Sequence, residues 1–231
     1  SGVTLAPEGG AHQSVSSPLI GIGQPGLLSY EPAYVDELAV LLRFGLDHLQ
    51  KPDGCSLYLR LSTRPLDQPQ RTLGPDLARD IIDGGYWLRE PAPDADLAIV
   101  CMGAVTPEAL QAWESVVRDF AGTGLLVITS PDRLHQDWLE AQRQRGRTTG
   151  RLSREPAPVE RLLAPLSRNA RLITVLDGHP LTLSWLGSVG PHRVVPLGVE
   201  SFGQSADIPD LYGKLRLDAA AIIDAVAVAV G

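Results

Sequence analysis

Residues 95–129 read ADLAIVCMGAVTPEALQAWESVVRDFAGTGLLVIT, and this stretch decides the fold of the chain. The run 96–102, DLAIVCM, is continuously apolar after Asp96, which is typical of a parallel strand buried on both faces. A helix is predicted next, because Thr106 suits the N-cap and Pro107 the first helical position. Two glycines end this helix, and 125–129 predicts the next strand. Strand, helix and strand in this order indicate a right-handed crossover within a parallel sheet.

The same alternation continues toward the C-terminus. Further helices are expected over 130–143, 158–166, 181–186 and, capped by Asp218, up to Val230, with strands over 171–177 and 192–197 and a charged loop at 145–153. The predicted fold class is therefore α/β, with helices on both faces of a mainly parallel sheet.

Residues upstream of this unit are typical of a smaller α/β segment. A helix after Pro32 places an apolar stripe from Leu38 to Leu49 along one side, and Pro52 ends it. The alternating run 55–62 predicts a strand. Residues 64–75 are polar and rich in proline, so we expect an extended connection there, followed by a short amphipathic piece.

Composition excludes several classes of protein. The 231 residues include 27 acidic and 20 basic side chains, a net charge of −7, which argues against a nucleic-acid-binding protein. No apolar run reaches the ~20 residues of a membrane helix. The two cysteines are too few for a disulfide framework or a four-cysteine zinc site, and favour a reduced, cytoplasmic setting. The chain opens at Ser1 without a methionine, and we expect it to be a piece of a longer protein.

One loop stands out as a candidate site, since the sequence has no nucleophile elbow, Walker loop or H-E-x-x-H motif. It lies in the glycine- and proline-rich first 29 residues, where 7–13 reads PEGGAHQ. Its two glycines permit tight turns that place Glu8 and His12 at one pocket. Such a pair suits proton transfer or hydrogen bonding to a substrate, and an ordinary surface turn is the equal alternative. His179 follows a predicted strand at the sheet edge where ligands bind, although a functional role is not favoured for it.

Four motifs resemble one enzyme family. SGVTLAPEGGAHQSV at 1–15 resembles a loop of transketolase-type enzymes, and 22–49, which contains SYEPAY, is similar to a region of the homodimeric pyruvate dehydrogenase decarboxylase component. GGYWLRE at 84–90 resembles the step into that family's C-terminal domain, and the family's closing motif matches 201–218. The chain thus resembles the C-terminal portion of a thiamine diphosphate-dependent, transketolase-like enzyme, most similar to the 2-oxo-acid dehydrogenases.

The resemblance implies how the chain is divided. Residues 1–75 correspond to the latter half of a pyrimidine-binding α/β domain, 76–91 to a linker, and 92–231 to a complete transketolase C-terminal-type α/β domain. Half a domain leaves an unpaired sheet edge and apolar helix faces for a partner to cover. Thiamine diphosphate and Mg²⁺ are then expected in the full enzyme, bound mainly by residues outside this chain, with no cofactor ligand and no metal ligand in this segment.

The implied reaction is decarboxylation of a 2-oxo acid with transfer of the acyl unit to a lipoyl carrier, for which this chain alone is not competent. By resemblance, Glu8 and His12 are catalytic, and His12, Gln13 and Arg64 bind substrate. Implied partners are the missing N-terminal half or a complementing chain, a second copy in a homodimer and the lipoyl acyltransferase component, but no nucleic acid and no membrane. A sugar transketolase fragment and a non-catalytic dimerisation or regulatory domain stay open, as does a solvated linker position for Arg64.

Overall fold

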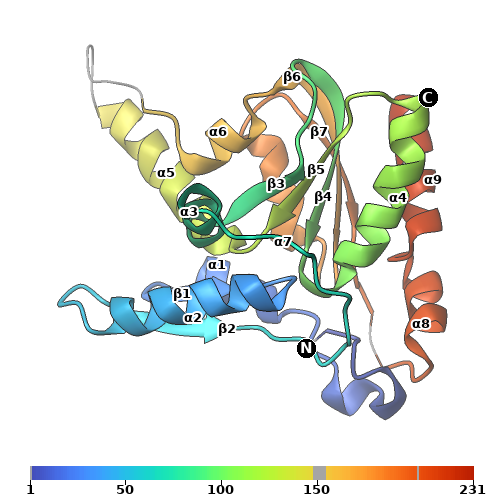
Figure 1. Cartoon of the computed structure of the whole chain (residues 1–231), viewed down its shortest axis with the longest axis horizontal. Coiled ribbons are helices and arrows are strands. Elements are labelled where there is room, and N and C mark those ends of the chain that lie inside the picture. The colour runs from blue at the N-terminus through green and yellow to red at the C-terminus, as the bar shows by residue number, and fades with distance from the viewer. Residues whose placement is uncertain (1, 148–154, 202) are drawn as a thin grey trace.

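The computed structural model describes residues 2–147, 155–201 and 203–231 (Figure 1). Its main element is a five-stranded sheet in the order β3-β5-β4-β6-β7. The strands are β3 (Gly85–Arg89), β4 (Ala95–Met102), β5 (Gly124–Ile128), β6 (Leu166–Leu176) and β7 (Arg193–Leu197). Neighbouring strands are parallel except β3, which pairs antiparallel with β5 at one edge. The predicted α/β class with a mainly parallel sheet is confirmed.

Helices cover both faces of this sheet, which explains the uninterrupted apolar run of β4. Ile99 and Cys101 share a core with α4 (Thr106–Asp119) and α9 (Ala219–Val230), which lie side by side on one face (Figure 1). Val100 and Met102 share the opposite core with α5, α6 and α7. These three helices are α5 (Pro131–Arg147), α6 (Pro158–Leu163) and α7 (Leu181–Ser184), and the η4 turn (Trp185–Ser188) continues α7. Asp218 caps α9 as predicted, its Oδ1 accepting from the Ala221 amide at 2.9 Å.

A smaller unit precedes the sheet. It contains α1 (Ser17–Gly23), β1 (Leu27–Tyr30), α2 (Val35–Leu49) and β2 (Ser56–Leu59), and β1 pairs parallel with β2. In Figure 1 this unit, in blue and cyan, lies below the main sheet. Helix α2 and strand β2 form where they were predicted, whereas α1 and β1 arise in a stretch expected to be turn-rich. Among the described residues, no helix has both the length and the apolar character needed to cross a bilayer.

Three local expectations differ from the structure. The stretch 76–91, expected as a linker with a short amphipathic piece, contains most of α3 (Pro75–Asp83), which fits that piece, and also β3, a strand that forms because β5 lies beside it. At the start of α4 a short turn, η3 (Gly103–Val105), comes first, so Thr106 lies inside the helix and its hydroxyl donates to the Gly103 carbonyl at 2.8 Å. The charged loop expected at 145–153 begins within α5, and residues 148–153 lie outside the described ranges.

One buried arginine joins the smaller unit to the sheet. Arg60 follows β2 and is only 3% exposed. Its guanidinium donates to both carboxylate oxygens of Glu31 at 2.6 Å and to the main-chain oxygens of Ser14 and Asp177 at 2.9 and 2.7 Å. Asp177 directly follows β6, and its carboxylate accepts from the Val3 amide at 2.8 Å. Burial raises the pKa of Glu31, and the charge of Arg60 opposes that rise.

A second set of hydrogen bonds joins the end of β1 to the end of β5. The Ser29 amide donates to Asp132 at 2.8 Å, and the Ser130 hydroxyl donates to the Ser29 carbonyl at 2.7 Å. The Glu31 amide donates to the Thr129 carbonyl at 2.8 Å. Open α/β sheets place ligands at this carboxyl edge of the strands. Here the chain's own polar groups fill that edge at the ends of β5 and β6.

We expect Arg60→Ala to lower the free energy of unfolding by about 3–5 kcal/mol, because the buried Glu31 carboxylate loses its cation. The folded-state pKa of Glu31 is already raised, and removing Arg60 raises it further. A raised carboxyl pKa means that stability falls as pH rises through it, so the loss should be larger near ~pH 8 than near ~pH 5. Urea unfolding at both pH values measures this difference.

The matched control for Arg60→Ala is Arg79→Ala. Arg79 pairs with Asp76 on the surface of α3, where both side chains are largely exposed. An exposed pair contributes little to stability, so this variant should unfold close to the wild type. Equal losses for the two arginine variants would contradict the role given to Arg60.

Candidate active site

The loop that carries Glu8 and His12 folds into two tight turns. The 3₁₀ turns η1 (Ala6–Glu8) and η2 (Gly10–His12) follow one another along the chain. Gly9 joins them with a φ of 72°, a left-handed conformation that glycine adopts without strain. Glu8 and His12 end the two turns, and both side chains are exposed. The loop therefore presents a carboxylate and an imidazole to the outside of this chain.

This loop is held against the segment 203–205. Gln13 Oε1 accepts from the Gly203 amide at 2.8 Å, and its Nε2 donates to the Gln204 carbonyl at 2.9 Å. The packing is so close that a Cβ atom on Gly10 would lie 2.7 Å from the Cα atom of Gly203. Both ends of the Gln13 amide are thus engaged, and Gln13 positions the loop. Substrate binding by Gln13 stays a prediction.

Arg64 lies at the start of α4. Its guanidinium donates to the two Glu108 carboxylate oxygens at 2.8 and 2.6 Å and to the Ala104 carbonyl at 2.9 Å. It also lies over the ring of Tyr212, 5.0 Å from the centroid. Hydrogen bonding to Glu108 raises the pKa of Arg64. The side chain is 17% exposed, so Arg64 is a paired cation and not a solvated linker residue.

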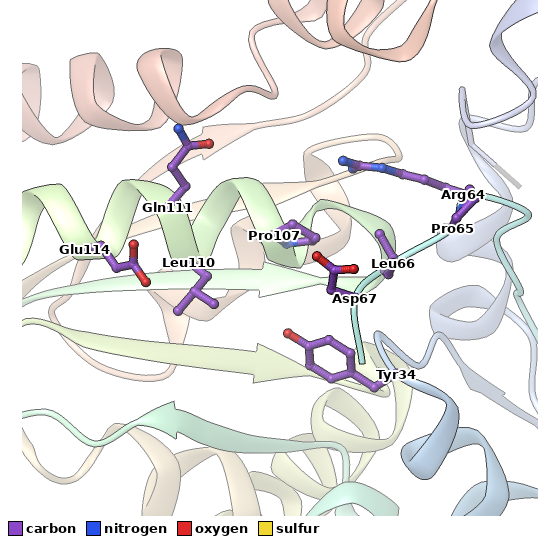
Figure 2. A pocket seen from close by; sticks show the side chains of 9 residues that line it. All are labelled: Tyr34, Arg64, Pro65, Leu66, Asp67, Pro107, Leu110, Gln111 and Glu114. Atoms are coloured by element: carbon purple, nitrogen blue, oxygen red, sulfur yellow. The ribbon is translucent and has the colours of Figure 1, made fainter. Parts of the chain in front are cut away.

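A cavity of about 360 Å³ lies beside Arg64 (Figure 2). Its lining residues are Tyr34, Arg64, Pro65, Leu66, Asp67, Pro107, Leu110, Gln111 and Glu114. A neighbouring cavity of about 230 Å³ shares Tyr34, Arg64 and Leu66 with it. Neither lining includes Glu8 or His12. Because the larger cavity is lined by two carboxylates and by an arginine that Glu108 already pairs, it is unsuited to a phosphorylated sugar.

His179 lies against Val15, just after the candidate loop. Its main-chain amide donates to the Val15 carbonyl at 3.0 Å, and its Nδ1 accepts from the Leu181 amide at 3.3 Å. The sheet edge next to it is occupied by Arg60 and Asp177. The structure thus gives the main chain and the ring of His179 contacts within the chain.

Sequence reasoning missed a buried polar cluster at the start of α2. Glu37 is fully buried and accepts from the Tyr86 hydroxyl, from the Ala33 amide at 2.7 Å and from Arg71 at 3.0 Å. Arg71 also pairs with Asp36 at 2.7 Å. Burial raises the pKa of Glu37, and burial together with the Glu37 charge raises that of Tyr86. Glu37 and Tyr86 belong to two of the motifs noted in the sequence, 22–49 and 84–90. Their hydrogen bond holds α2 against β3, and those motifs were the signal that could have revealed the cluster.

We expect Gly10→Ala to destabilise the chain by about 1–3 kcal/mol, because the added methyl group meets the Gly203 backbone and the loop must shift. Gly23→Ala is the control, since a Cβ on Gly23 meets nothing within 4 Å. That variant should be neutral or slightly stabilised. Urea unfolding compares the two, and limited proteolysis should cleave the loop faster in Gly10→Ala only. A Gly10→Ala protein as stable as Gly23→Ala would show that the loop is not held there.

Comparisons with known proteins extend these observations. No family model matches the chain. The chain is 26% identical over 230 residues to the pyruvate dehydrogenase E1 component of Mycolicibacterium smegmatis and 23% identical over 228 residues to that of Escherichia coli K12. These matches cover 96% and 95% of this chain. The chain spans about a quarter of the length of both relatives, 24% and 25%.

Solved structures show the same fold. Transketolase from Leishmania mexicana superposes with a TM-score of 0.72 at 16% identity, covering 97% of this chain and 28% of that one. A chain described as a split gene transketolase, an inactive beta4 tetramer, gives a TM-score of 0.61 at 18% identity and is covered over 61% of its length. In sequence and fold, the chain therefore fits a C-terminal portion of a thiamine diphosphate-dependent, transketolase-like enzyme, as its motifs indicated.

Proposed function

We propose that this chain is the C-terminal part of a thiamine diphosphate-dependent 2-oxo-acid dehydrogenase, which decarboxylates a 2-oxo acid and passes the acyl unit to a lipoyl carrier. Similarity to pyruvate dehydrogenase E1 components along 96% of the chain supports this. Because the chain spans a quarter of those relatives, the missing N-terminal half or a complementing chain supplies the rest of the enzyme. The proposed assembly is a cytoplasmic homodimer that delivers its product to a lipoyl acyltransferase.

The observation that carries the proposal is a loop that is held in place while its functional groups stay exposed. Gln13 and the close packing of Gly10 fix its backbone. The imidazole of His12 is then free to donate a hydrogen bond to a substrate oxygen or to take up a proton from it. Glu8, on the preceding turn, accepts hydrogen bonds from the same ligand. A site needs this combination of fixed backbone and free polar groups.

Thiamine diphosphate supplies the nucleophilic carbon and the electron sink that decarboxylation of a 2-oxo acid requires. Among the described residues, no three His, Cys, Asp or Glu side chains gather in a group able to hold a metal ion. The proposal assigns Mg²⁺ and the diphosphate to the completing chain. This chain contributes Glu8 and His12, which orient the substrate and hold or move a proton at its oxygen atoms.

The smaller unit offers a surface on which the completing chain is proposed to dock. Exposed apolar side chains on α2 and just after β2 are Val35, Leu42, Leu46, Leu49 and Leu61. Leu42 and Leu46 are 44% and 64% exposed, although they belong to the apolar stripe of the sequence. The two-stranded sheet has no third strand among the described residues. Apolar side chains gathered on a surface in this way mark protein contacts.

Two alternatives are compared with this proposal. A sugar transketolase shares the fold, but the cavity beside Arg64 has no unpaired cation in its lining for a sugar phosphate. A non-catalytic dimerisation or regulatory role is favoured by the likeness to a split gene transketolase described as an inactive tetramer. Turnover by the completed enzyme separates all three.

We expect the chain, assayed together with its upstream half, to oxidise a 2-oxo acid from a panel of such acids in the presence of an artificial electron acceptor. His12→Gln should lower kcat/KM by about 100-fold, because an acid–base group contributes roughly 10²–10⁴-fold. His135→Gln, a change of the same chemistry on α5, should leave kcat/KM close to the wild-type value. Turnover of ketose phosphates only, or equal activity of the two variants, contradicts the assignment.

The isolated 231-residue chain is expected to bind thiamine diphosphate weakly, with a dissociation constant above about the micromolar range. The reason is that the proposed diphosphate and metal ligands lie on the completing chain. Isothermal titration calorimetry with and without that chain measures the difference. Micromolar binding by the isolated chain would place cofactor ligands in this segment and refute the division.

A further inference from the structure

A thiol and an imidazole meet at the turn between α2 and β2, at the far end of the smaller unit from the main sheet (Figure 1). His48 lies in the last turn of α2, and Cys55 directly precedes β2. The Cys55 Sγ atom is 3.4 Å from His48 Nε2, and the Cys55 amide donates to the same nitrogen at 3.1 Å. The Phe44 ring stacks on the imidazole, with centroids 5.5 Å apart and planes inclined by 18°.

These contacts fix which nitrogen carries the proton. Because Nε2 accepts a hydrogen bond from a backbone amide, its lone pair points toward Cys55 and the ring proton is on Nδ1. Phe44 and the Cys55 amide hold the ring in that orientation. The arrangement has the parts of an activated nucleophile, namely a thiol, a base within hydrogen-bond reach and groups that orient the base.

We propose that Cys55 is a modification site, a thiol that His48 activates for exchange with small disulfides. The turn before it, residues 51–54, is exposed, and Cys55 itself is partly exposed. The sulfur therefore lies beside an exposed turn, from which a small disulfide can approach it. The Glu8 and His12 loop takes no part in this reaction, so the proposal stands independently of the proposed enzyme activity.

The exchange balances without any further oxidant. Since the Cys55 amide occupies the Nε2 lone pair, that hydrogen bond has to give way before the thiol proton passes to Nε2. Sγ then attacks one sulfur of the disulfide, and the S–S bond of the disulfide breaks. The leaving thiolate takes the proton from Nε2, which returns His48 to its starting state. The products are a mixed disulfide on Cys55 and one free small thiol.

The second cysteine of the chain is an internal reference. Cys101 lies on β4 with an exposed fraction of 0%, and burial raises the pKa of its thiol to about 12. A buried thiol of this kind is chemically inert in the folded protein. Any probe that distinguishes the two cysteines therefore reports on the surroundings of Cys55.

Oxidised glutathione is the probe, and mass spectrometry of the purified protein, digested without reductant, gives the rate at each cysteine. We expect Cys55 to be modified at ~pH 7 and Cys101 only after unfolding in urea. His48→Gln keeps an acceptor for the Cys55 amide but removes the base. The rate at Cys55 should then fall by about tenfold, because a thiol without a neighbouring base is only a few per cent thiolate. His135→Gln should leave that rate unchanged.

A pH series separates activation from structure. Near ~pH 10 the rates of the wild type and of His48→Gln should converge, because hydroxide then deprotonates the thiol in both proteins. A variant that is slow only because its turn is distorted stays slow at high pH, and that result overturns the proposal. So does an equal rate for the two proteins near ~pH 7. Alkylation by iodoacetamide without any glutathione adduct overturns small disulfides as the substrate class.

Discussion

The guanidinium of Arg60 lies in the interior with its hydrogen bonds directed to segments that are far apart in the sequence. Glu31 comes from the end of β1, Ser14 from the N-terminal loop and Asp177 from the end of β6. A buried cation is tolerated only where its N–H groups find acceptors, so these segments must meet at one place. The position of the smaller unit on the sheet depends on this side chain together with the hydrogen bonds at Asp132.

The candidate loop takes its position from the same junction. At one end, the Asp177 carboxylate accepts from the Val3 amide, and at the other, Gln13 is hydrogen-bonded to Gly203 and Gln204. The first and the last of the sequence motifs therefore form one surface, although about 190 residues separate them. Their spacing in the chain does not predict this contact. The contact forms because the end of β6 and the segment 203–205 both lie next to the N-terminal loop.

Much of the larger unit is predictable from the sequence because its signals are local. The run of β4 is apolar since both of its faces are covered, and Asp218 caps α9 through its own side chain. Strand β3 is different, because it is a strand only through its pairing with β5. A five-residue segment that begins at the second of two glycines contains too little pattern to indicate an edge strand.

The candidate site also has a part that the local sequence predicts and a part that depends on distant contacts. Glu8, His12 and Gln13 are close in sequence, so the motif predicts their shared loop. Arg64 finds its partner Glu108 forty-four positions later, and no pattern in the sequence announces that pairing. An arginine that resembles a substrate ligand by position is thus neutralised within the chain, which follows only from where α4 begins.

Helix α2 has apolar side chains on two sides, and this explains why only part of its predicted apolar stripe is buried here. Leu41 and Gly45 face inward, so closely that a Cβ on Gly45 would lie 2.2 Å from the Leu57 side chain. Leu42, Leu46 and Leu49 face outward and are exposed. A helix that is apolar on more than one side is typical of the interior of a domain. A two-stranded sheet is also too small to be stable by itself. Hydrogen bonds at Arg60 and Asp132 hold this sheet to the rest of the chain, but only on one side. The proposed completing chain therefore has to add a layer over α2 and a strand beside β1 or β2, and a contact at the Glu8 and His12 loop alone would leave that face of α2 uncovered.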